Sequence, residues 1–125
     1  MSETKTVLII DDDSRNIFAL SAVLKAKGYH VVSALSAVEG ITRLKNNKSI
    51  SVVLLDIMMP DMDGYQAIAA IRASEQISRV PIIAVTAQAM VGDREKCLDA
   101  GADDYISKPI DVDALLDLLA NYQME

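Results

Sequence analysis

Tryptophan is absent from this chain, cysteine occurs once, and no hydrophobic run is long enough to span a bilayer. The lone Cys97 cannot form an intramolecular disulfide, which excludes a secreted disulfide scaffold and points to a reducing compartment. A transmembrane helix needs about 20 consecutive apolar residues, and a signal peptide needs an apolar core that residues 1–5 lack. We therefore expect a cytoplasmic protein with no membrane span.

Aromatic residues and positive charges are also scarce. Aromatics make up 4% of the chain, and 12 Lys and Arg against 18 Asp and Glu give a net charge of -6 at pH 7. Proteins that bind nucleic acids directly use clustered cations, and often aromatic side chains on which bases stack. The composition therefore argues against nucleic acid as a direct ligand and favours a small or protein partner.

The chain does have enough apolar material for one domain. Its 125 residues are 51% hydrophobic, and a chain of this length buries roughly two-thirds of its unfolded surface. We expect a single domain over residues 1–125, with its core at about 5–122.

Short apolar runs alternate with segments of helical spacing along the whole sequence. Such runs are typical of buried parallel strands, and strict alternation requires right-handed crossovers with helices on both faces of the sheet. The pattern predicts an α/β protein, a flavodoxin-like (βα)5 three-layer sandwich with a five-stranded parallel sheet of order 2-1-3-4-5. The expected strands centre on residues 7–10, 31–32, 52–55, 82–85 and 105–106.

Helix boundaries are also marked in the sequence. Ser36 to Glu39 reads as a capping box, Gly28 and Gly101 stand where helices should end, and Asp111 can cap the last helix. Gly92 falls inside the expected fourth helix, which we therefore predict to be the least stable helix.

Acidic residues follow two of the strands directly. Asp11, Asp12 and Asp13 follow the first strand, and Asp56 follows the third. In the order 2-1-3-4-5 ligands bind between the carboxyl ends of these two strands, so at least two of the acids should converge on Asp56. Their mutual repulsion calls for a compensating cation, for which Mg²⁺ is the natural candidate and Mn²⁺ is plausible. Asp13 is better explained as a helix cap.

Two more strand ends bring a hydroxyl and an ammonium to the same edge of the sheet. Thr86 and Ala87 follow the fourth strand, where the hydroxyl can donate to an oxyanion and the small side chain leaves space. Lys108 follows the fifth strand, and its bond to Pro109 is a candidate cis peptide. Together with Asp56 as nucleophile, these groups make a phosphoryl-acceptor site.

Four separated motifs at these strand ends resemble the receiver domain of two-component response regulators. The motifs agree in order and spacing over essentially the whole chain, and jointly they are highly specific. They are VLIIDDD at 7–13, LLDIMMPDMDG at 54–64, AVTA at 84–87 and DYISKP at 104–109.

The resemblance implies roles for individual residues. Asp56 would be phosphorylated, while Asp12, Asp56 and the backbone carbonyl of Met58 would ligate Mg²⁺ directly, and Asp11 would act through a metal-bound water. Lys108 would pair with the phosphate.

The resemblance also implies a conformational switch. Thr86 would move toward the phosphoryl group and Tyr105 would turn inward behind it, remodelling the face formed by the fourth helix, fifth strand and fifth helix. Met58 and Gln88 lie two residues beyond Asp56 and Thr86, where side chains can cover the phosphoryl group, so we expect them to alter the rate of hydrolysis.

The implied partners are a sensor histidine kinase or a histidine phosphotransfer protein as donor, and a downstream protein effector that the sequence does not identify. Phosphorylation and dephosphorylation would be self-catalysed, which falls short of an independent enzyme. Residues 13–20 and 92–98 resemble receivers attached to hybrid histidine kinases. A stand-alone receiver and a module of a longer kinase both remain open.

Three other functions are alternatives to that of a phosphorylated receiver. Carboxylates at 11–13 would oppose the flavin phosphate of an electron carrier. A calcium loop centred on Gly64 would need Met59 and Ala70 as ligands, so residues 61–64 are better explained as a turn. A degenerate receiver that serves as a phosphorylation-independent binding platform remains the alternative.

Overall fold

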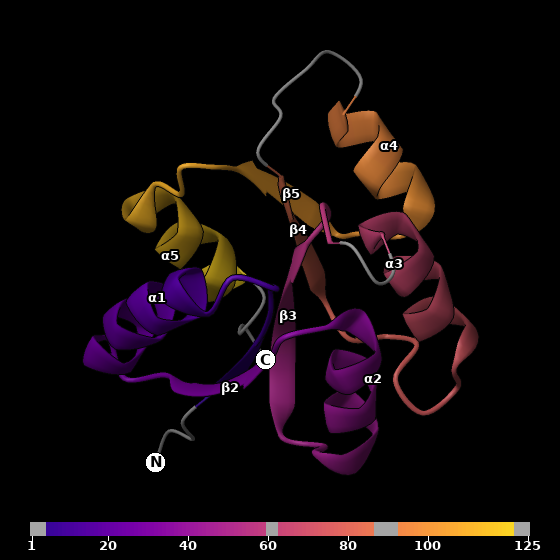
Figure 1. Ribbon diagram of the computed structural model, residues 1–125, viewed down its shortest axis with the longest axis horizontal. Coiled ribbons are helices and arrows are strands. Elements are labelled where there is room, and N and C mark those ends of the chain that lie inside the picture. The colour runs from indigo at the N-terminus through magenta and orange to yellow at the C-terminus, as the bar shows by residue number, and fades with distance from the viewer. Residues whose placement is uncertain (1–4, 60–62, 87–92, 122–125) are drawn as a thin grey trace.

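The computed structural model describes residues 5–59, 63–86 and 93–121. These residues form one parallel five-stranded sheet of order β2-β1-β3-β4-β5 with helices on both faces (Figure 1). The strands are β1 (Thr6–Ile10), β2 (His30–Ala34), β3 (Ile50–Asp56), β4 (Ile82–Thr86) and β5 (Asp104–Ser107). The helices are α1 (Ser14–Ala26), α2 (Ala37–Asn46), α3 (Gly64–Ala73), α4 (Asp93–Ala100) and α5 (Val112–Asn121). The predicted fold class, strand order and strand positions are confirmed.

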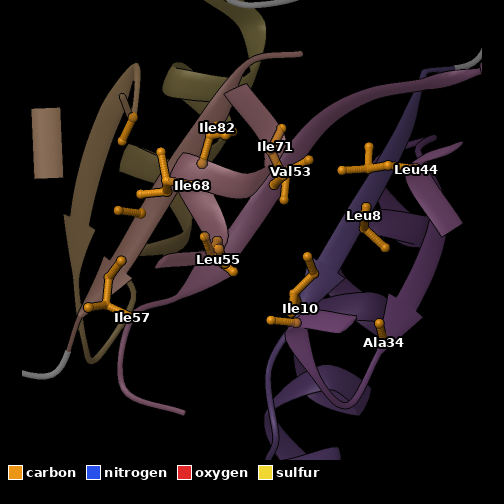
Figure 2. Packing of buried hydrophobic residues seen from close by; sticks show 14 of the residues in the cluster. Leu8, Ile10, Ala34, Leu44, Val53, Leu55, Ile57, Ile68, Ile71 and Ile82 are labelled. Carbon is orange, nitrogen blue, oxygen red and sulfur yellow. The ribbon is translucent and has the colours of Figure 1, made fainter. Parts of the chain in front are cut away.

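The sheet separates two hydrophobic clusters because successive strand residues face opposite sides. In β1, Leu8 and Ile10 belong to the cluster beneath α2, α3 and α4, whereas Val7 and Ile9 belong to the cluster beneath α1 and α5. Figure 2 shows the first cluster, in which Ile68 and other α3 side chains meet strand residues. This double burial explains why the strands read as continuous apolar runs.

The predicted helix caps hold, with one difference. The side chain of Ser36 accepts from the Glu39 amide at 3.1 Å, but the Glu39 carboxylate accepts from the Leu35 amide rather than from Ser36. That carboxylate also pairs with Arg43 at 2.9 Å, so the capping box predicted at Ser36 is incomplete.

A complete capping box lies instead at the start of α3, where the sequence suggested only a turn. Asp63 accepts from the Gln66 amide, and the Gln66 side chain accepts from the Asp63 amide. Gly64 is the first residue of α3, and an added Cβ would lie 2.6 Å from the Cα of Ile57. Glycine is therefore needed here for close approach of two backbones.

The remaining helix ends agree with the sequence where they are described. Gly28 and Gly101 follow α1 and α4 with φ of 95° and 120°. Asp13 caps α1, and Asp111 accepts from two amides at the start of α5. Gly92 lies outside the described residues, so its effect on α4 stays a prediction.

Two further features complete the description of the chain. Cys97, a residue of α4, is fully buried, with 0% of its surface exposed, in the same hydrophobic cluster as Ala102. No helix among the described residues is both long and apolar enough to cross a membrane.

Candidate functional site

The register of the sheet places the acidic residues of β1 and β3 side by side. Ile10 pairs with Leu55, so the residues that follow them, Asp11 and Asp56, leave the sheet at neighbouring positions. The Asp11 amide donates to the Ala34 carbonyl at 3.1 Å, which extends the backbone pairing to the end of β2. Both carboxylates thus stand on backbone that the sheet fixes.

Three carboxylates meet at this edge. Asp11, Asp12 and Asp56 each offer an oxygen within 4.8 Å of the others. Asp11 and Asp56 are buried, with 4% and 5% of their surface exposed, whereas Asp12 is exposed. Asp13, the fourth acid considered, points to the start of α1 as its cap.

Lys108 brings a positive charge to the two buried acids. Its Nζ lies 3.7 Å from Asp11 and 3.6 Å from Asp56, which is too long for direct hydrogen bonds but close enough for strong Coulomb attraction. The Lys108 amide donates to the Thr86 carbonyl at 2.7 Å, and the bond from Lys108 to Pro109 is cis. The backbone after β5 is therefore tied to the end of β4.

Burial raises the pKa of the Asp56 carboxyl, and the nearby Asp11 carboxylate adds to that rise. The Met58 amide, which donates to Asp56 at 3.1 Å, and the Lys108 ammonium act in the opposite direction. The net effect is a carboxylate whose charge is only partly compensated by the protein's own groups.

These residues fit a hard divalent cation. The donors are carboxylate oxygens, which Mg²⁺ prefers, and its bonds of about 2.1 Å require ligand oxygens within about 4.2 Å of one another. The observed limit of 4.8 Å among Asp11, Asp12 and Asp56 approaches that spacing. The uncompensated negative charge at Asp56 gives the cation an electrostatic reason to bind.

The other residues expected in the site lie around this cluster. Thr86 ends β4 and is buried, and Tyr105 lies half-buried in β5, where it pairs with Ala84. The Met58 side chain is 57% exposed, beside the Asp56 carboxylate that its amide contacts. Ala87 and Gln88 lie outside the described residues.

A cavity of about 480 Å³ adjoins the carboxylates, a feature that the sequence did not predict. Its polar lining includes Asp11, Asp56, Lys108 and Asn16, and its walls are mostly apolar. Asn16 stands in the first turn of α1, within the segment 13–20 that resembles other receivers, but the sequence did not mark it as a site residue. The apolar part of the lining comes from Ile9, Ile10, Ala19, Leu20, Val23, Leu54, Val85, Pro109, Ile110 and Val112.

Comparison with known proteins identifies the class that this fold and site define. The family model described as the response regulator receiver domain matches residues 7–120. The chain therefore belongs to the response regulator receiver domain family, whose members are phosphoryl acceptors in two-component phosphorelay signalling rather than classical enzymes.

Particular relatives include both kinases and small regulators. The chain is 40% identical over 121 residues to hybrid signal transduction histidine kinase L of Dictyostelium discoideum. The aligned region covers 93% of this chain but 7% of that protein. It is 31% identical over 119 residues to the polar-differentiation response regulator DivK of Brucella ovis. Here the aligned region covers 95% of this chain and 96% of that protein. The chain thus spans a small part of one relative and nearly the whole of the other.

One similar solved structure contains a magnesium ion. The receiver domain of the sensor histidine kinase PA1611 from Pseudomonas aeruginosa is 35% identical, with a TM-score of 0.86 over 96% of this chain and 98% of that one. That crystal structure has a magnesium ion coordinated in its active site cleft.

Proposed function

We propose that Asp56 accepts a phosphoryl group from a phosphohistidine in a sensor histidine kinase or a histidine phosphotransfer protein. The observation that carries this proposal is the buried Asp56 carboxylate, grouped with Asp11 and Asp12 and facing the Lys108 ammonium at 3.6 Å. On this proposal residues 1–125 act as a single receiver domain.

The transfer is a displacement at phosphorus. An oxygen of the Asp56 carboxylate forms the new P–O bond as the P–N bond to the donor imidazole breaks, and the imidazole leaves with the electron pair of that bond. Asp56 must be ionised for this attack. The Lys108 ammonium and the Met58 amide, both beside its carboxylate, favour that ionised form.

The protein's own groups then hold the phosphoryl oxygens. Lys108 supplies a positive charge, and the Thr86 hydroxyl at the end of β4 supplies a hydrogen-bond donor. We assign a Mg²⁺ site to Asp12, Asp56 and the Met58 carbonyl, with Asp11 acting through water. When bound there, the ion neutralises the charge that develops on the transferred group.

Phosphorylation changes the charge at this edge of the sheet and so biases the arrangement of neighbouring groups. We propose that Thr86 moves toward the phosphoryl group and that Tyr105 turns inward behind it. This proposal is supported by adjacent strands, because Thr86 and Tyr105 lie in β4 and β5, which pair with each other. The remodelled face of α4, β5 and α5 would then contact a downstream protein.

Hydrolysis of the phosphoryl group would return the domain to its starting state. Water must reach the phosphorus, and the exposed Met58 side chain stands beside Asp56 where it can limit that access. Gln88 is proposed for the same role from its place two residues after Thr86. The domain would catalyse both its own phosphorylation and its own hydrolysis.

Intact mass spectrometry tests this function. The protein is incubated with Mg²⁺ and acetyl phosphate, and we expect one phosphoryl adduct that disappears in Asp56→Asn and when a chelator removes the metal. Asp13→Asn is the matched control, because Asp13 belongs to the same acidic run but caps α1. It should retain the adduct.

A persistent adduct in Asp56→Asn would overturn the assignment of the phosphorylated residue. Absence of an adduct from acetyl phosphate, and also from histidine-phosphorylated donor proteins, would favour the alternative of a phosphorylation-independent binding platform.

A further inference from the structure

Arg72, in the last turn of α3, joins two loops that are distant in sequence. Its Nε donates to the Gly101 carbonyl at 2.9 Å, and one terminal nitrogen donates to the carbonyls of Ser78 at 2.9 Å and Val80 at 2.7 Å. The other terminal nitrogen contacts the Asp103 carboxylate at 2.8 Å. One side chain therefore links the loop before β4 to the loop before β5.

Asp103 extends this network to the first residue of β4. Its carboxylate accepts from the Ile82 amide at 2.8 Å, and its own amide donates to the Ile82 carbonyl at 2.8 Å. The planar guanidinium of Arg72 is suited to this geometry because its donors point in fixed, divergent directions. The amino ends of β4 and β5 are thus fixed to each other and to α3.

The same network fastens the carboxyl end of α4. Gly101 and Ala102 donate backbone hydrogen bonds to Leu98 and Cys97 at 3.0 and 3.1 Å, and Cys97 is fully buried. The Gly101 carbonyl, which directly follows α4, is the group that Arg72 Nε binds.

The described side chains earlier in α4 lie at the surface. Arg94, Glu95 and Lys96 are exposed, and the Lys96 ammonium lies over the Tyr65 ring at 5.1 Å, a surface contact between α4 and α3. Figure 1 shows α4 beside α3 on one face of the sheet. The carboxyl end of α4 is therefore joined to the Arg72 network, whereas the described side chains at 94–96 face solvent.

We infer that Arg72 is a positioning residue that anchors the amino ends of β4 and β5 together with the carboxyl end of α4. The anchor confines the change driven from Asp56 to the opposite ends of these elements, where Thr86 and Lys108 lie. Only the confinement of the change rests on the proposed phosphorylation of Asp56. The anchor itself is present in the unphosphorylated protein.

The reactivity of Cys97 can report on this anchor, because Cys97 is the only cysteine in the sequence and is buried in the carboxyl half of α4. Its reaction rate with an aromatic disulfide reagent measures how often that end opens. We expect Arg72→Gln to raise the reaction rate of Cys97 by about tenfold or more at unchanged reagent concentration. The reagent reaches Cys97 only when this end of α4 opens, so the rate increases in proportion to the open population. Urea unfolding of each variant separates local opening from global instability.

Arg43→Gln is the matched control. Arg43 also lies in a helix and pairs with a carboxylate, but its partner is Glu39 of the same helix, α2. Its Cys97 rate should stay within about twofold of the parent rate. Arg72→Lys keeps the positive charge but lacks the divergent donors of the guanidinium, so it should also raise the Cys97 rate. It serves as a second variant if Arg72→Gln does not fold. Equal rates in the parent and in folded Arg72 variants would overturn the anchor.

Phosphorylation then tests confinement, with the adduct checked by intact mass. In the parent protein the Cys97 rate should not rise on phosphorylation, whereas in the Arg72 variant it should rise by a further severalfold. A rise of the Cys97 rate in the phosphorylated parent would show that the change is not confined to the opposite ends of these elements. Equal rates in the phosphorylated and unphosphorylated variant would also overturn this part of the inference, because that result is expected if Arg72 only stabilises the fold. If no adduct forms from acetyl phosphate or from histidine-phosphorylated donor proteins, the proposed function fails, while the rates measured without donor still decide the anchor.

Discussion

At the scale of single residues, the site is a balance between buried negative charge and one nearby ammonium. Asp11 and Asp56 lie almost out of contact with solvent, and Lys108 approaches both without a short hydrogen bond. Such an arrangement costs folding free energy when no cation is bound, because buried carboxylates are poorly solvated. The destabilising charge lies at the residue proposed to accept the phosphoryl group.

The pH dependence of stability follows from Asp56. Its pKa is raised in the folded state, chiefly by burial, so the native protein holds this proton to higher pH than the unfolded chain does. Stability therefore falls as pH rises from the ordinary aspartate pKa, about 4, through the raised value. Without divalent metal at pH 7, we expect Asp56→Asn to be about 1 kcal/mol more stable than the parent in urea unfolding.

The gain should shrink as the pH is lowered through the same window, because the parent carboxyl then becomes neutral as well. Asp13→Asn, which alters a helix cap that asparagine also serves, should give no comparable gain. An Asp56→Asn protein that is less stable than the parent at neutral pH would contradict this description of the site.

Lys108 and a divalent cation compete for the same carboxylates. Removing the ammonium by Lys108→Met, which keeps an unbranched side chain, should tighten Mg²⁺ binding by about fivefold, equivalent to about 1 kcal/mol. Isothermal titration in the absence of phosphoryl donor measures this affinity.

Lys45→Met is the control for the Lys108 variant, because Lys45 is an exposed residue in the last turn of α2. Its Mg²⁺ affinity should match that of the parent. Weaker binding in Lys108→Met would show that Lys108 helps to build the metal site rather than competing with the cation.

At the scale of elements, the ends of helices explain how the strands deliver their side chains. Capping at Ser36, Asp63 and Asp111 starts three helices directly after the loops at the carboxyl edge of the sheet. The sequence predicted the helix starts at Ser36 and Asp111, although the capping box predicted at Ser36 is incomplete. Asp63 and Gln66 form the same kind of cap, but Gly64 between them suggests a turn in the sequence instead of a helix start.

Two helix-ending glycines offer a matched stability test. Both have positive φ, but a Cβ at Gly28 would meet nothing within 4 Å, whereas one at Gly101 would lie 3.0 Å from Ile68 and 3.1 Å from Arg72. We expect Gly28→Ala to cost about 1 kcal/mol from backbone strain alone and Gly101→Ala about 2 kcal/mol or more.

The comparison is made by urea unfolding of both variants beside the parent. Equal losses would mean that the contacts of Gly101 with Ile68 and Arg72 relax freely and that the end of α4 is not tightly packed.

At the scale of the whole molecule, much of the fold was predictable because it follows from the alternation of short apolar runs with segments of helical spacing. The run from Val7 to Ile10 is apolar at every position, since its residues enter both clusters, and this pattern predicts a buried parallel strand. Topology then brings Asp11 and Asp56 together without any knowledge of side-chain packing. The acidic cluster was therefore accessible from the sequence.

Long-range side-chain geometry was not predictable in this way. Arg72 and Asp103 are 31 residues apart, and neither residue stands in a pattern that predicts an ion pair. The full burial of Cys97 depends on how α4 sits on the sheet, and the cavity beside Asn16 depends on how α1 and the segment after β5 pack. Such features require three-dimensional packing, which hydrophobic periodicity does not encode.

The most direct test of the central claim is to locate the phosphoryl group. After incubation with Mg²⁺ and a phosphoryl donor, borohydride reduction converts an aspartyl phosphate to homoserine, and peptide sequencing by mass spectrometry finds the converted residue. We predict homoserine at position 56 and unchanged aspartate at positions 11, 12 and 13. Conversion at one of those three positions instead, or a phosphorylated protein in which Asp56 remains aspartate, would contradict the account.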